Sequence, residues 1–600
     1  MTQKEHIDSV SYHGRLAQLD RALPSGGKGQ RFESSNDQNC QMVLYPTKEL
    51  VYLIYLIDIN NKDNDVKRRL PLALAAFVAV ILVWLIRPLK SNEWDIEFDP
   101  QLQDGKNQYL DVLAQNKSLK NRPNVVIILA DDLGMTDISL YGSPYIDTPN
   151  IDSIGEQGIT YAQAYSTAPI CSPSRAGLLT GRYQNRYGFD SQPMTRYARN
   201  QLEYLGFKYF INTKPMYLIN NHSIPNPDQI ERQGMPPTEI LLSEALSASG
   251  YHCDAVGKWH LGYGDLQFPD NRGFKSFFGF LDAFSYYINP EQEGVESWQF
   301  DEFSEKHIWK QHREGFSAIL RDGTVVDEKE HLTDAFAREA SSRIRDAALS
   351  ENPFFLYIPF SAPHTPFQAL SKYTARFQNI EDPRKRIYYA LIAQLDDAVG
   401  RILKTLDETG EADNTLVIFS SDNGGATYTG ATGNDPLRGG KMSHFEGGLS
   451  VPLMMRWPGV IQKGSNESRP VIQMDLFNTI MASAGIPLPE DRMMDGINLL
   501  DDSAMDKTVN RPLFWRSDYN HIVQYRQWKL MMNGKDGKIW LYNIAEDREE
   551  NNNLADVKPE IVEKLKSMFE EWNIEMQKPA WPRVMDYLYD EDGEGYWFAT

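Results

Sequence analysis

Cysteine is scarce in this chain of 600 residues, which contains only Cys40, Cys171 and Cys253. Three cysteines so widely spaced do not indicate a disulfide framework, and Cys253 has no obvious partner. His260 and His364 are also too far from cysteines and from other histidines in the sequence to suggest a zinc cluster. We therefore expect no structural disulfide and no zinc centre.

Positive charge is in short supply as well. The chain has 61 Lys and Arg residues against 82 Asp and Glu residues, which gives a formal net charge of −21. Such a balance favours solubility and argues against nucleic acid as a partner. With 41% hydrophobic and 24% charged residues the composition is globular. A chain of this length exceeds one ordinary core, so two domains are expected.

A long apolar run occurs near the N-terminus. Lys67, Arg68 and Arg69 precede the unbroken apolar segment 70–86. Basic residues before such a segment favour a cytoplasmic N-terminus and a signal anchor or uncleaved signal peptide, with a buried core helix as the alternative. This interpretation predicts a transmembrane protein, attached to the membrane through residues 70–86, whose main folded part lies outside the cytoplasm, in the periplasm or extracellular space.

From Asn124 onward, short apolar strands alternate with helical patterns. The predicted strands are 125–129, 253–256, 354–358 and 416–419, and the predicted helices are 238–248, 334–348, 388–406 and 474–484. This alternation indicates an α/β fold with a large, mostly parallel mixed sheet flanked by helices. Beyond about residue 505, four strand signals and a helical pattern at 559–575 predict a smaller C-terminal antiparallel sheet plus helix.

These patterns divide the chain into five parts. The expected parts are 1–66, disordered or following a misassigned start codon; 67–90, the anchor; 91–121, a tether; 122–500, the catalytic domain; and 501–600, an antiparallel α+β subdomain. Two aromatic-bearing stretches, 189–233 and 285–330, interrupt the alternation. Long loops of this kind are usually functional, so we expect them to form walls of a pocket. The alternative is that they are surface loops without a function.

Polar residues that can bind a metal ion or take part in catalysis follow each predicted strand. Asp131 and Asp132 end the first, Lys258 and His260 follow the second, His364 follows the third, and Asp422 and Asn423 follow the fourth. Ligands bind at the carboxyl ends of strands in open α/β sheets, so these residues are expected to form one site. Adjacent carboxylates at the end of a buried strand repel each other, and a divalent cation would relieve that repulsion.

Cys171-Ser172-Pro173-Ser174-Arg175 is expected to begin a helix, with Ser172 as N-cap and Pro173 at the first position. Backbone N–H groups and the helix dipole there favour an anion, and Arg175 adds a bidentate donor. The alternative is an inert buried cysteine.

The run from Cys171 to Arg175, continued by Leu179-Thr180-Gly181-Arg182, resembles the signature of type I sulfatases. The chain resembles this family over about residues 122–575, because further family motifs appear in family order. They are Ala130-Asp131-Asp132-Leu133-Gly134, Gly257-Lys258-Trp259-His260-Leu261-Gly262, Ala362-Pro363-His364-Thr365-Pro366, Ser421-Asp422-Asn423-Gly424-Gly425 and Arg438-Gly439-Gly440-Lys441. The family belongs to the alkaline phosphatase superfamily.

The resemblance implies a sulfuric ester hydrolase, an arylsulfatase-like sulfatase, with a modified nucleophile. In the family a maturation enzyme converts the cysteine, here Cys171, to formylglycine (3-oxoalanine), and its hydrated form attacks sulfur. The resemblance also implies calcium, or magnesium in some members; the implied ligands are Asp131, Asp132, Cys171, Asp422 and Asn423. An oxygen-rich set does suit a hard cation.

The expected roles of the other site residues follow from the negative charge of the sulfate ester. Arg175, Lys258 and Lys441 are expected to surround the sulfate with positive charge, while Asp422 acts as the base for attack. The resemblance assigns protonation of the leaving group to His364, shared with Lys441, and expulsion of sulfate to His260. The expected substrate-binding residues are Lys258, His364, Arg438 and Lys441.

A sulfated polysaccharide or oligosaccharide is the expected substrate, because the aromatic-bearing stretches exceed what hydrolysis alone requires. Three alternatives remain at this point: a phosphate ester hydrolase, a phosphonate ester hydrolase of the same superfamily, and a non-catalytic binder of sulfated glycans. The binder is disfavoured because no catalytic position is missing.

Overall fold

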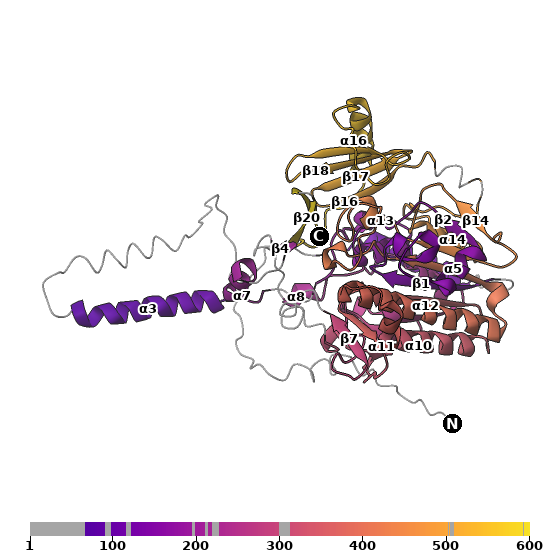
Figure 1. The fold of residues 1–600 in the computed structure, drawn as a ribbon, viewed down its shortest axis with the longest axis horizontal. Coiled ribbons are helices and arrows are strands. Elements are labelled where there is room, and N and C mark those ends of the chain that lie inside the picture. The colour runs from indigo at the N-terminus through magenta and orange to yellow at the C-terminus, as the bar shows by residue number, and fades with distance from the viewer. Residues whose placement is uncertain are drawn as a thin grey trace, which may run out of the picture. The chain divides into compact units, whose positions relative to one another are not determined.

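The computed structural model places the predicted strand around Val125 at the centre of a ten-stranded sheet (Figure 1). The structure describes residues 66–89, 96, 98–115, 122–194, 198–210, 214–218, 227–298, 312–501, 503, 509–591 and 593–600. Met1–Val80 and Ile81–Thr600 are two separate units, and each is described by itself. The prediction of disorder for residues 1–65 lies outside the described residues, as does Cys40.

Five neighbouring strands of the sheet run parallel. Strand β1 (Asn124–Asp131) lies between β12 (Thr415–Ser421) and β10 (Phe354–Pro363), and β5 (His252–Lys258) and β6 (Ser276–Phe280) follow beyond β10. The remaining strands complete the two edges: β13 (Leu453–Arg456), β2 (Ile159–Tyr161) and β14 (Ser465–Glu467) beyond β12, and β8 (Leu320–Arg321) and β9 (Thr324–Val325) beyond β6. The expected mixed, mostly parallel sheet is confirmed.

The side chains of β1 alternate between two cores, one on each face of the sheet. Val126 and Ile128 belong to one core, and Val125, Ile127 and Leu129 belong to the other. Successive residues of a strand point to opposite faces, so a wholly apolar strand requires cover on both. Because both faces are covered, the residues from Val125 to Ala130 are all apolar.

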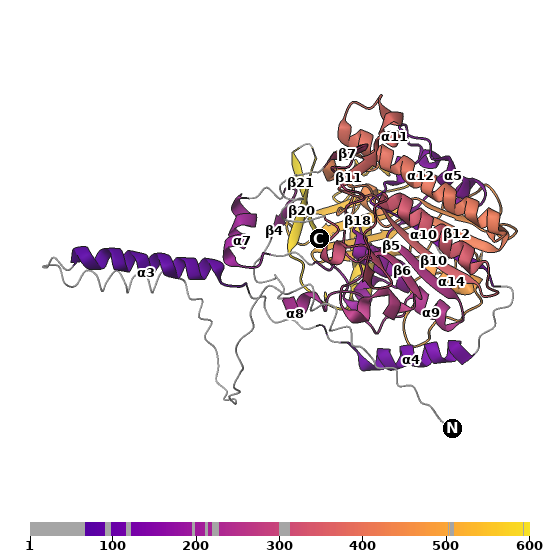
Figure 2. The same cartoon turned by 90° about the horizontal axis from the view of Figure 1, so that it is seen from below.

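Helices supply that cover (Figure 2). Those of the first core are α5 (Pro149–Glu156), α10 (Leu332–Ala347) and α12 (Pro383–Thr409); those of the second are α6 (Cys171–Thr180), α9 (Leu242–Ala248) and α14 (Asp475–Ser483). Shorter elements are α7 (Gln201–Leu205), α8 (Pro227–Ile230), α11 (Ser371–Thr374), α13 (Glu446–Leu449), β3 (Ala164–Tyr165), β7 (Val295–Trp298), β11 (Phe367–Leu370) and β15 (Val471–Ile472).

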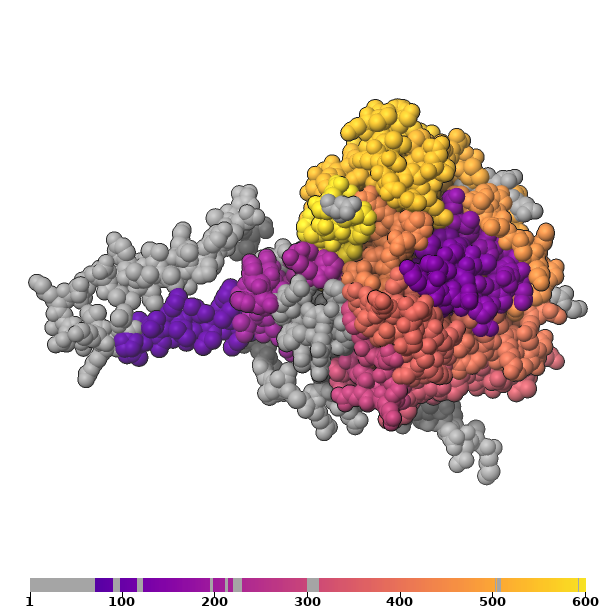
Figure 3. Space-filling model, in the orientation of Figure 1, coloured from indigo at the N-terminus to yellow at the C-terminus, as the bar shows by residue number. Residues whose placement is uncertain are grey.

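The C-terminal region forms an antiparallel sheet plus a helix, as predicted. Its strands are β16 (Leu513–Ser517), β17 (Asn520–Tyr525), β18 (Trp528–Asn533) and β19 (Ile539–Asn543), and helix α16 (Pro559–Ile574) packs against them. A hairpin of β20 (Met585–Glu591) and β21 (Glu594–Ala599), joined by β4 (Met216–Leu218), was not predicted. Figure 3 shows the yellow C-terminal surface directly against the orange residues that precede it.

The predicted membrane span is wrong. Helix α3 covers Val66–Ile86, but no described helix is both long and apolar enough to cross a membrane. The apolar run Leu70–Ile86 measures only about 26 Å at 1.5 Å per residue, whereas the hydrocarbon core of a bilayer is ~30 Å thick. Residues 70–86 are therefore not a transmembrane segment, and the expected attachment to a membrane through them is not supported.

The stretch expected to be a tether contains helix α4 (Pro100–Gln115). Its Lys106 is buried, and the Lys106 Nζ lies 2.6 Å from Glu244 Oε1 of α9 and donates to the backbone carbonyl of Pro237. Burial lowers the pKa of Lys106 to about 8, against the opposing effect of Glu244. A buried ammonium requires such partners, so α4 is fixed to the catalytic part and is not a free linker.

A buried ion cluster joins the C-terminal sheet to the catalytic part. Lys529 of β18 places its Nζ 2.9 Å from Glu446 Oε1, at the start of α13, and 2.9 Å from Glu550 Oε1. All three side chains are fully buried. Buried carboxylates are costly without a counter-charge, so the two regions depend on this lysine.

We therefore expect Lys529→Met to lower the free energy of unfolding by about 3–5 kcal/mol, because Glu550 would lose its buried cation and Glu446 would keep only the more distant Arg548. Denaturant-induced unfolding of the purified protein measures this change. Lys404→Met is the control: Lys404 lies on the exposed surface, 3.4 Å from Glu408, and its loss should change stability by less than about 1 kcal/mol. Equal stability of the two variants would contradict the expectation.

Candidate active site

Four parallel strands end side by side and place the predicted residues at one edge of the sheet. The order β12-β1-β10-β5 brings their carboxyl ends together. Asp422 follows β12, Asp131 ends β1, His364 follows β10 and Lys258 ends β5. Sequence order alone does not bring these segments together; the parallel pairing does.

Helix α6 places Cys171 at the same edge. The helix begins at Cys171 itself with Ile170 as its N-cap, so the prediction of Ser172 as N-cap is wrong. The Ser172 hydroxyl instead donates to the carbonyl oxygen of His260 at 2.5 Å. Pro173 lies within the first turn, where its missing N–H leaves no helical hydrogen bond unmade.

The Cys171 thiol faces the two aspartates that end β1. Its Sγ lies 3.4 Å from Asp131 Oδ1 and 3.9 Å from Asp132 Oδ1. Burial, with the nearby charge of Asp422, raises the pKa of Cys171 far above its usual value, against the effects of Lys258 and Lys441. The unmodified side chain is therefore a thiol and a poor nucleophile.

Each buried carboxylate has a cation as its partner. Lys258 Nζ lies 2.7 Å from Asp131 Oδ2, and Lys441 Nζ lies 2.8 Å from Asp132 Oδ1. Arg175 binds Asp422 Oδ2 through Nε at 2.9 Å and Nη2 at 2.8 Å, and its Nη1 donates to the Lys258 carbonyl at 2.8 Å. Three carboxylates therefore face three cations in a region that is almost fully buried.

These pairs set the protonation of the two aspartates. Burial alone would raise the pKa of Asp131, but Lys258, His364 and Arg175 outweigh it and hold the pKa below its usual value. Burial likewise opposes ionisation of Asp132, and Lys441 with His364 lowers its pKa. Both side chains are therefore carboxylates and can offer oxygen ligands.

His364 is hydrogen-bonded through both ring nitrogens. Its Nδ1 lies 2.5 Å from the Thr365 carbonyl oxygen, which only accepts, so Nδ1 carries the proton. Its Nε2 lies 3.0 Å from Lys441 Nζ and 3.5 Å from Asp132 Oδ2. Burial and the charge of Lys441 lower the pKa of His364, so a neutral ring accepts a hydrogen bond from the ammonium of Lys441.

His260 differs from His364. Neither of its ring nitrogens has a hydrogen-bond partner among the residues that the structure describes, although the side chain is fully buried. Burial, together with Lys258 and Arg175, holds its pKa well below the usual value. An unpaired imidazole in a polar site is available to accept a proton.

The site also offers ligands for a hard cation. Ligand atoms of Asp131, Asp132, Cys171 and His364 all lie within 4.8 Å of one another. Asn423 donates through Nδ2 to Asp132 Oδ1 at 2.8 Å, while its buried Oδ1 has no partner within the described part of the chain. Carboxylate and amide oxygens of this kind fit calcium or magnesium.

Arg438 is not brought into this group. Its Nε lies 2.6 Å from Glu591 Oε2, and its Nη2 donates to the Tyr596 hydroxyl at 2.8 Å. The guanidinium also lies over the ring of Phe445. Glu591 and Tyr596 belong to the C-terminal region, so Arg438 links the segment that carries Lys441 to that region. Its expected role in substrate binding stays a prediction.

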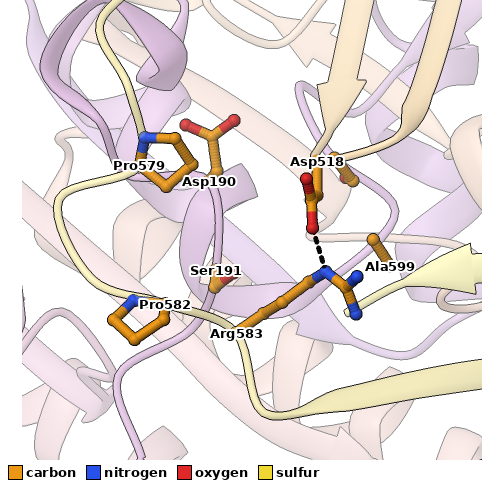
Figure 4. Close-up of a pocket in the computed structure, with 8 residues that line it drawn as sticks. Asp190, Ser191, Asp518, Pro579, Pro582, Arg583 and Ala599 are labelled. Atoms are coloured by element: carbon orange, nitrogen blue, oxygen red, sulfur yellow. Dashed lines mark hydrogen bonds and ion pairs between the residues drawn. The ribbon is translucent and has the colours of Figure 1, made fainter. Parts of the chain in front are cut away.

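Two cavities are lined by residues that were not among the predicted site residues. One, of about 180 Å³, is shown in Figure 4. Its lining residues are Asp190, Ser191, Ser517, Asp518, Pro579, Pro582, Arg583 and Ala599. Asp518 and Arg583 form an ion pair there with Nε and Oδ2 2.5 Å apart. The second cavity, of about 740 Å³, is lined by residues including Met135, Leu437 and Arg548.

The geometry defines the class of protein: a hydrolase site for an anionic ester, with cations and two histidines around a single buried cysteine. The comparisons agree. Residues 123–486 match the family described as Sulfatase, and residues 440–575 match N-sulphoglucosamine sulphohydrolase, C-terminal. The chain belongs to the sulfatase family, which is formylglycine-dependent and part of the alkaline phosphatase superfamily, and it is a sulfuric ester hydrolase.

Named relatives and structures support the same assignment. The chain is 34% identical to N-acetylgalactosamine-6-sulfatase of Homo sapiens over 397 residues, covering 66% of this chain and 68% of the relative. It is 29% identical to a sulfatase of Formosa agariphila over 527 residues, covering 77% and 91%. It is also similar to the crystal structure of Ps i-CgsB, with a TM-score of 0.65, 30% identity and coverage of 77% and 94%.

Proposed function

We propose that this sulfatase removes sulfate from a sulfated carbohydrate, using formylglycine made from Cys171 and a bound calcium ion. One observation supports the proposal most strongly. The side chains that end or follow four parallel strands, together with Lys441, converge on Cys171 at the N-terminus of α6. Hydrated formylglycine supplies one hydroxyl for attack on sulfur and a second one for expelling sulfate.

The charges support binding of an anion in an acidic protein. Asp131, Asp132 and Asp422 balance Arg175, Lys258 and Lys441, so the cluster is neutral as it stands. A divalent cation held by Asp131, Asp132, Asp422 and Asn423 would supply positive charge for the sulfate oxygens. The net positive charge would then be local, within reach of one sulfate group, although the whole chain carries −21.

The two histidines divide the proton transfers between them. Nε2 of His364 and the ammonium of Lys441 are in hydrogen-bond contact, so together they hold a proton that can pass to the departing sugar oxygen. His260, whose ring nitrogens have no hydrogen-bond partner among the described residues, is free to accept a proton when sulfate is expelled. Arg175 binds Asp422 through Nε and Nη2 and so fixes the orientation of its carboxyl group.

A carbohydrate substrate is supported by the named relatives. One acts, by its name, on N-acetylgalactosamine 6-sulfate, and Ps i-CgsB has been crystallised with k-i-k-neocarrahexaose. Phe284 is the residue just before the stretch 285–330, which interrupts the α/β alternation. The centroid of its ring lies 6.2 Å from the centroid of the His364 ring. Aromatic faces commonly pack against sugars at such positions.

Cys171→Ala should abolish sulfate ester hydrolysis while the protein stays folded, because position 171 supplies the nucleophile. Hydrolysis and thermal unfolding of the purified variant test this directly. Cys253→Ala is a matched control, since Cys253 is equally buried but lies at the start of β5, away from the charged cluster. Retention of most activity by Cys171→Ala, or loss of activity in both variants, would argue against the proposal.

Calcium should stabilise the parent protein against thermal unfolding, by about 2.7 kcal/mol when its concentration is 100 times the dissociation constant. Asp131→Asn and Asn423→Ala should reduce that stabilisation, whereas Asp556→Asn, an exposed site, should preserve it. Melting curves with calcium and with chelator give the answer without an activity assay. Stoichiometric zinc in the active enzyme, with neither calcium nor magnesium, would contradict the proposed calcium site.

The preferred substrate should be a sulfate at the non-reducing end of a sugar chain. A panel of N-acetylgalactosamine 6-sulfate, k-i-k-neocarrahexaose and 4-nitrophenyl sulfate would be compared by kcat/KM. We expect a sugar sulfate to exceed the aryl sulfate. Preference for the aryl ester, or release of sulfate from interior units while both ends remain sulfated, would refute the assignment.

A further inference from the structure

The hydroxyl of one tyrosine contacts backbone carbonyl groups of the loop that carries His364. Tyr287 lies with its Oη 2.8 Å from the carbonyl oxygen of His364, and it also contacts the carbonyl oxygen of Ser361. The two carbonyls belong to the end of β10 and to the residue that follows it. One buried phenol therefore bridges both sides of the turn from which the His364 ring projects.

Tyr287 is itself held firmly. Its backbone N–H donates to Gln368 Oε1 at 2.8 Å, and its carbonyl accepts from the Leu332 N–H at 2.8 Å. Its ring stacks on the ring of His331, with centroids 5.1 Å apart and an angle of 24° between planes. Tyr287, Gln368 and His331 are all at most 1% exposed.

His331 completes this support in a defined tautomer. Its Nδ1 accepts from the Thr333 N–H at 3.3 Å, so the proton is on Nε2, which donates to the Gln368 carbonyl at 2.8 Å. Gln368 lies in β11, four residues after His364, and accepts from Tyr287 as described above. Tyr287 and His331 thus fix the chain at residues 361, 364 and 368 through hydrogen bonds. Neither residue belongs to the cluster of Asp131, Asp132, Asp422, Arg175, Lys258 and Lys441.

We propose that Tyr287 is a positioning residue for His364: its hydroxyl holds the turn so that the Nε2 of His364 stays beside Lys441 and Asp132. The inference rests on the proposed role of His364 in protonating the leaving group. The distances at stake are 3.0 Å to Lys441 Nζ and 3.5 Å to Asp132 Oδ2. Misplacement of a reacting group by ~1 Å can cost on the order of 100-fold in rate.

This role makes a specific prediction about leaving groups. A sugar alkoxide is strongly basic and needs a proton as it departs, whereas 4-nitrophenolate is a stable anion and does not. Loss of the hydroxyl in Tyr287→Phe should therefore lower kcat/KM about tenfold for N-acetylgalactosamine 6-sulfate or the best sugar sulfate of the panel, and less than about threefold for 4-nitrophenyl sulfate. A tyrosine that only stabilised the fold would lower both equally.

The ratio of the two kcat/KM values is the readout, because it does not depend on the fraction of protein that is folded. Tyr251→Phe is the matched control: the buried Tyr251 hydroxyl donates to the Pro123 carbonyl at 3.0 Å, at the opposite end of β1. Its ratio should equal that of the parent enzyme. His364→Ala serves as the reference and should show a selective loss larger than that of Tyr287→Phe.

Each outcome has one meaning. If the parent hydrolyses no sulfate ester, the proposed function fails and the inference fails with it. If His364→Ala affects both esters equally, the acid role of His364 fails, and the inference with it. If His364→Ala is selective but Tyr287→Phe is not, the inference alone is overturned. Should Tyr287→Phe not fold, Gln368→Met, which removes the acceptor for the Tyr287 N–H, should change the ratio in the same direction.

Discussion

Charge compensation among buried side chains is the constraint on which this structure depends. Asp131, Asp132 and Asp422 lie at adjacent strand ends with almost no access to water, where an unpaired carboxylate would cost several kcal/mol. Arg175, Lys258 and Lys441 offset those charges from a helix, a strand and a loop. Each carboxylate therefore requires a cation from a distant part of the sequence, and the fold must bring the two together.

The same compensation explains how an acidic protein handles an anionic ester. The cluster is balanced before any ion or substrate is added, so any cation bound there appears as net positive charge at one point. Screening limits its reach to roughly 10 Å, which restricts attraction to a single sulfate group. The C-terminal sheet has a similar arrangement, because Lys529 and Arg548 offset the charges of Glu446 and Glu550 at the junction.

Much of the fold could be predicted from the sequence because its determinants are local. The apolar strand at Val125 and the amphipathic helix α12 have patterns that only a buried strand and a packed helix satisfy. The hairpin β20–β21 was missed because its aromatic and acidic residues follow no regular two-residue alternation and because it pairs with the distant β4. The apolar segment 70–86 was misjudged because an unbroken apolar pattern does not by itself show that the helix is long and apolar enough to cross a bilayer.

The site was predictable where residues follow strands and unpredictable where contacts are long-range. Asp131 and His364 could be assigned from their positions after apolar runs. Arg438 could not be placed, because its partner Glu591 is 153 residues away. Tyr287 was missed for the same reason: its hydroxyl contacts backbone carbonyls 74 and 77 residues further along the chain, and backbone acceptors leave no trace in the sequence.

The central claim is that Cys171 is the precursor of the nucleophile, and the mass of the peptide that contains it tests this most directly. Purified enzyme with measured sulfatase activity would be digested, and the peptide spanning Cys171 would be weighed. The account predicts a mass lower than that of the cysteine form, as conversion of a thiol to an aldehyde requires, in proportion to activity. A fully active enzyme in which this peptide retains its cysteine would contradict it.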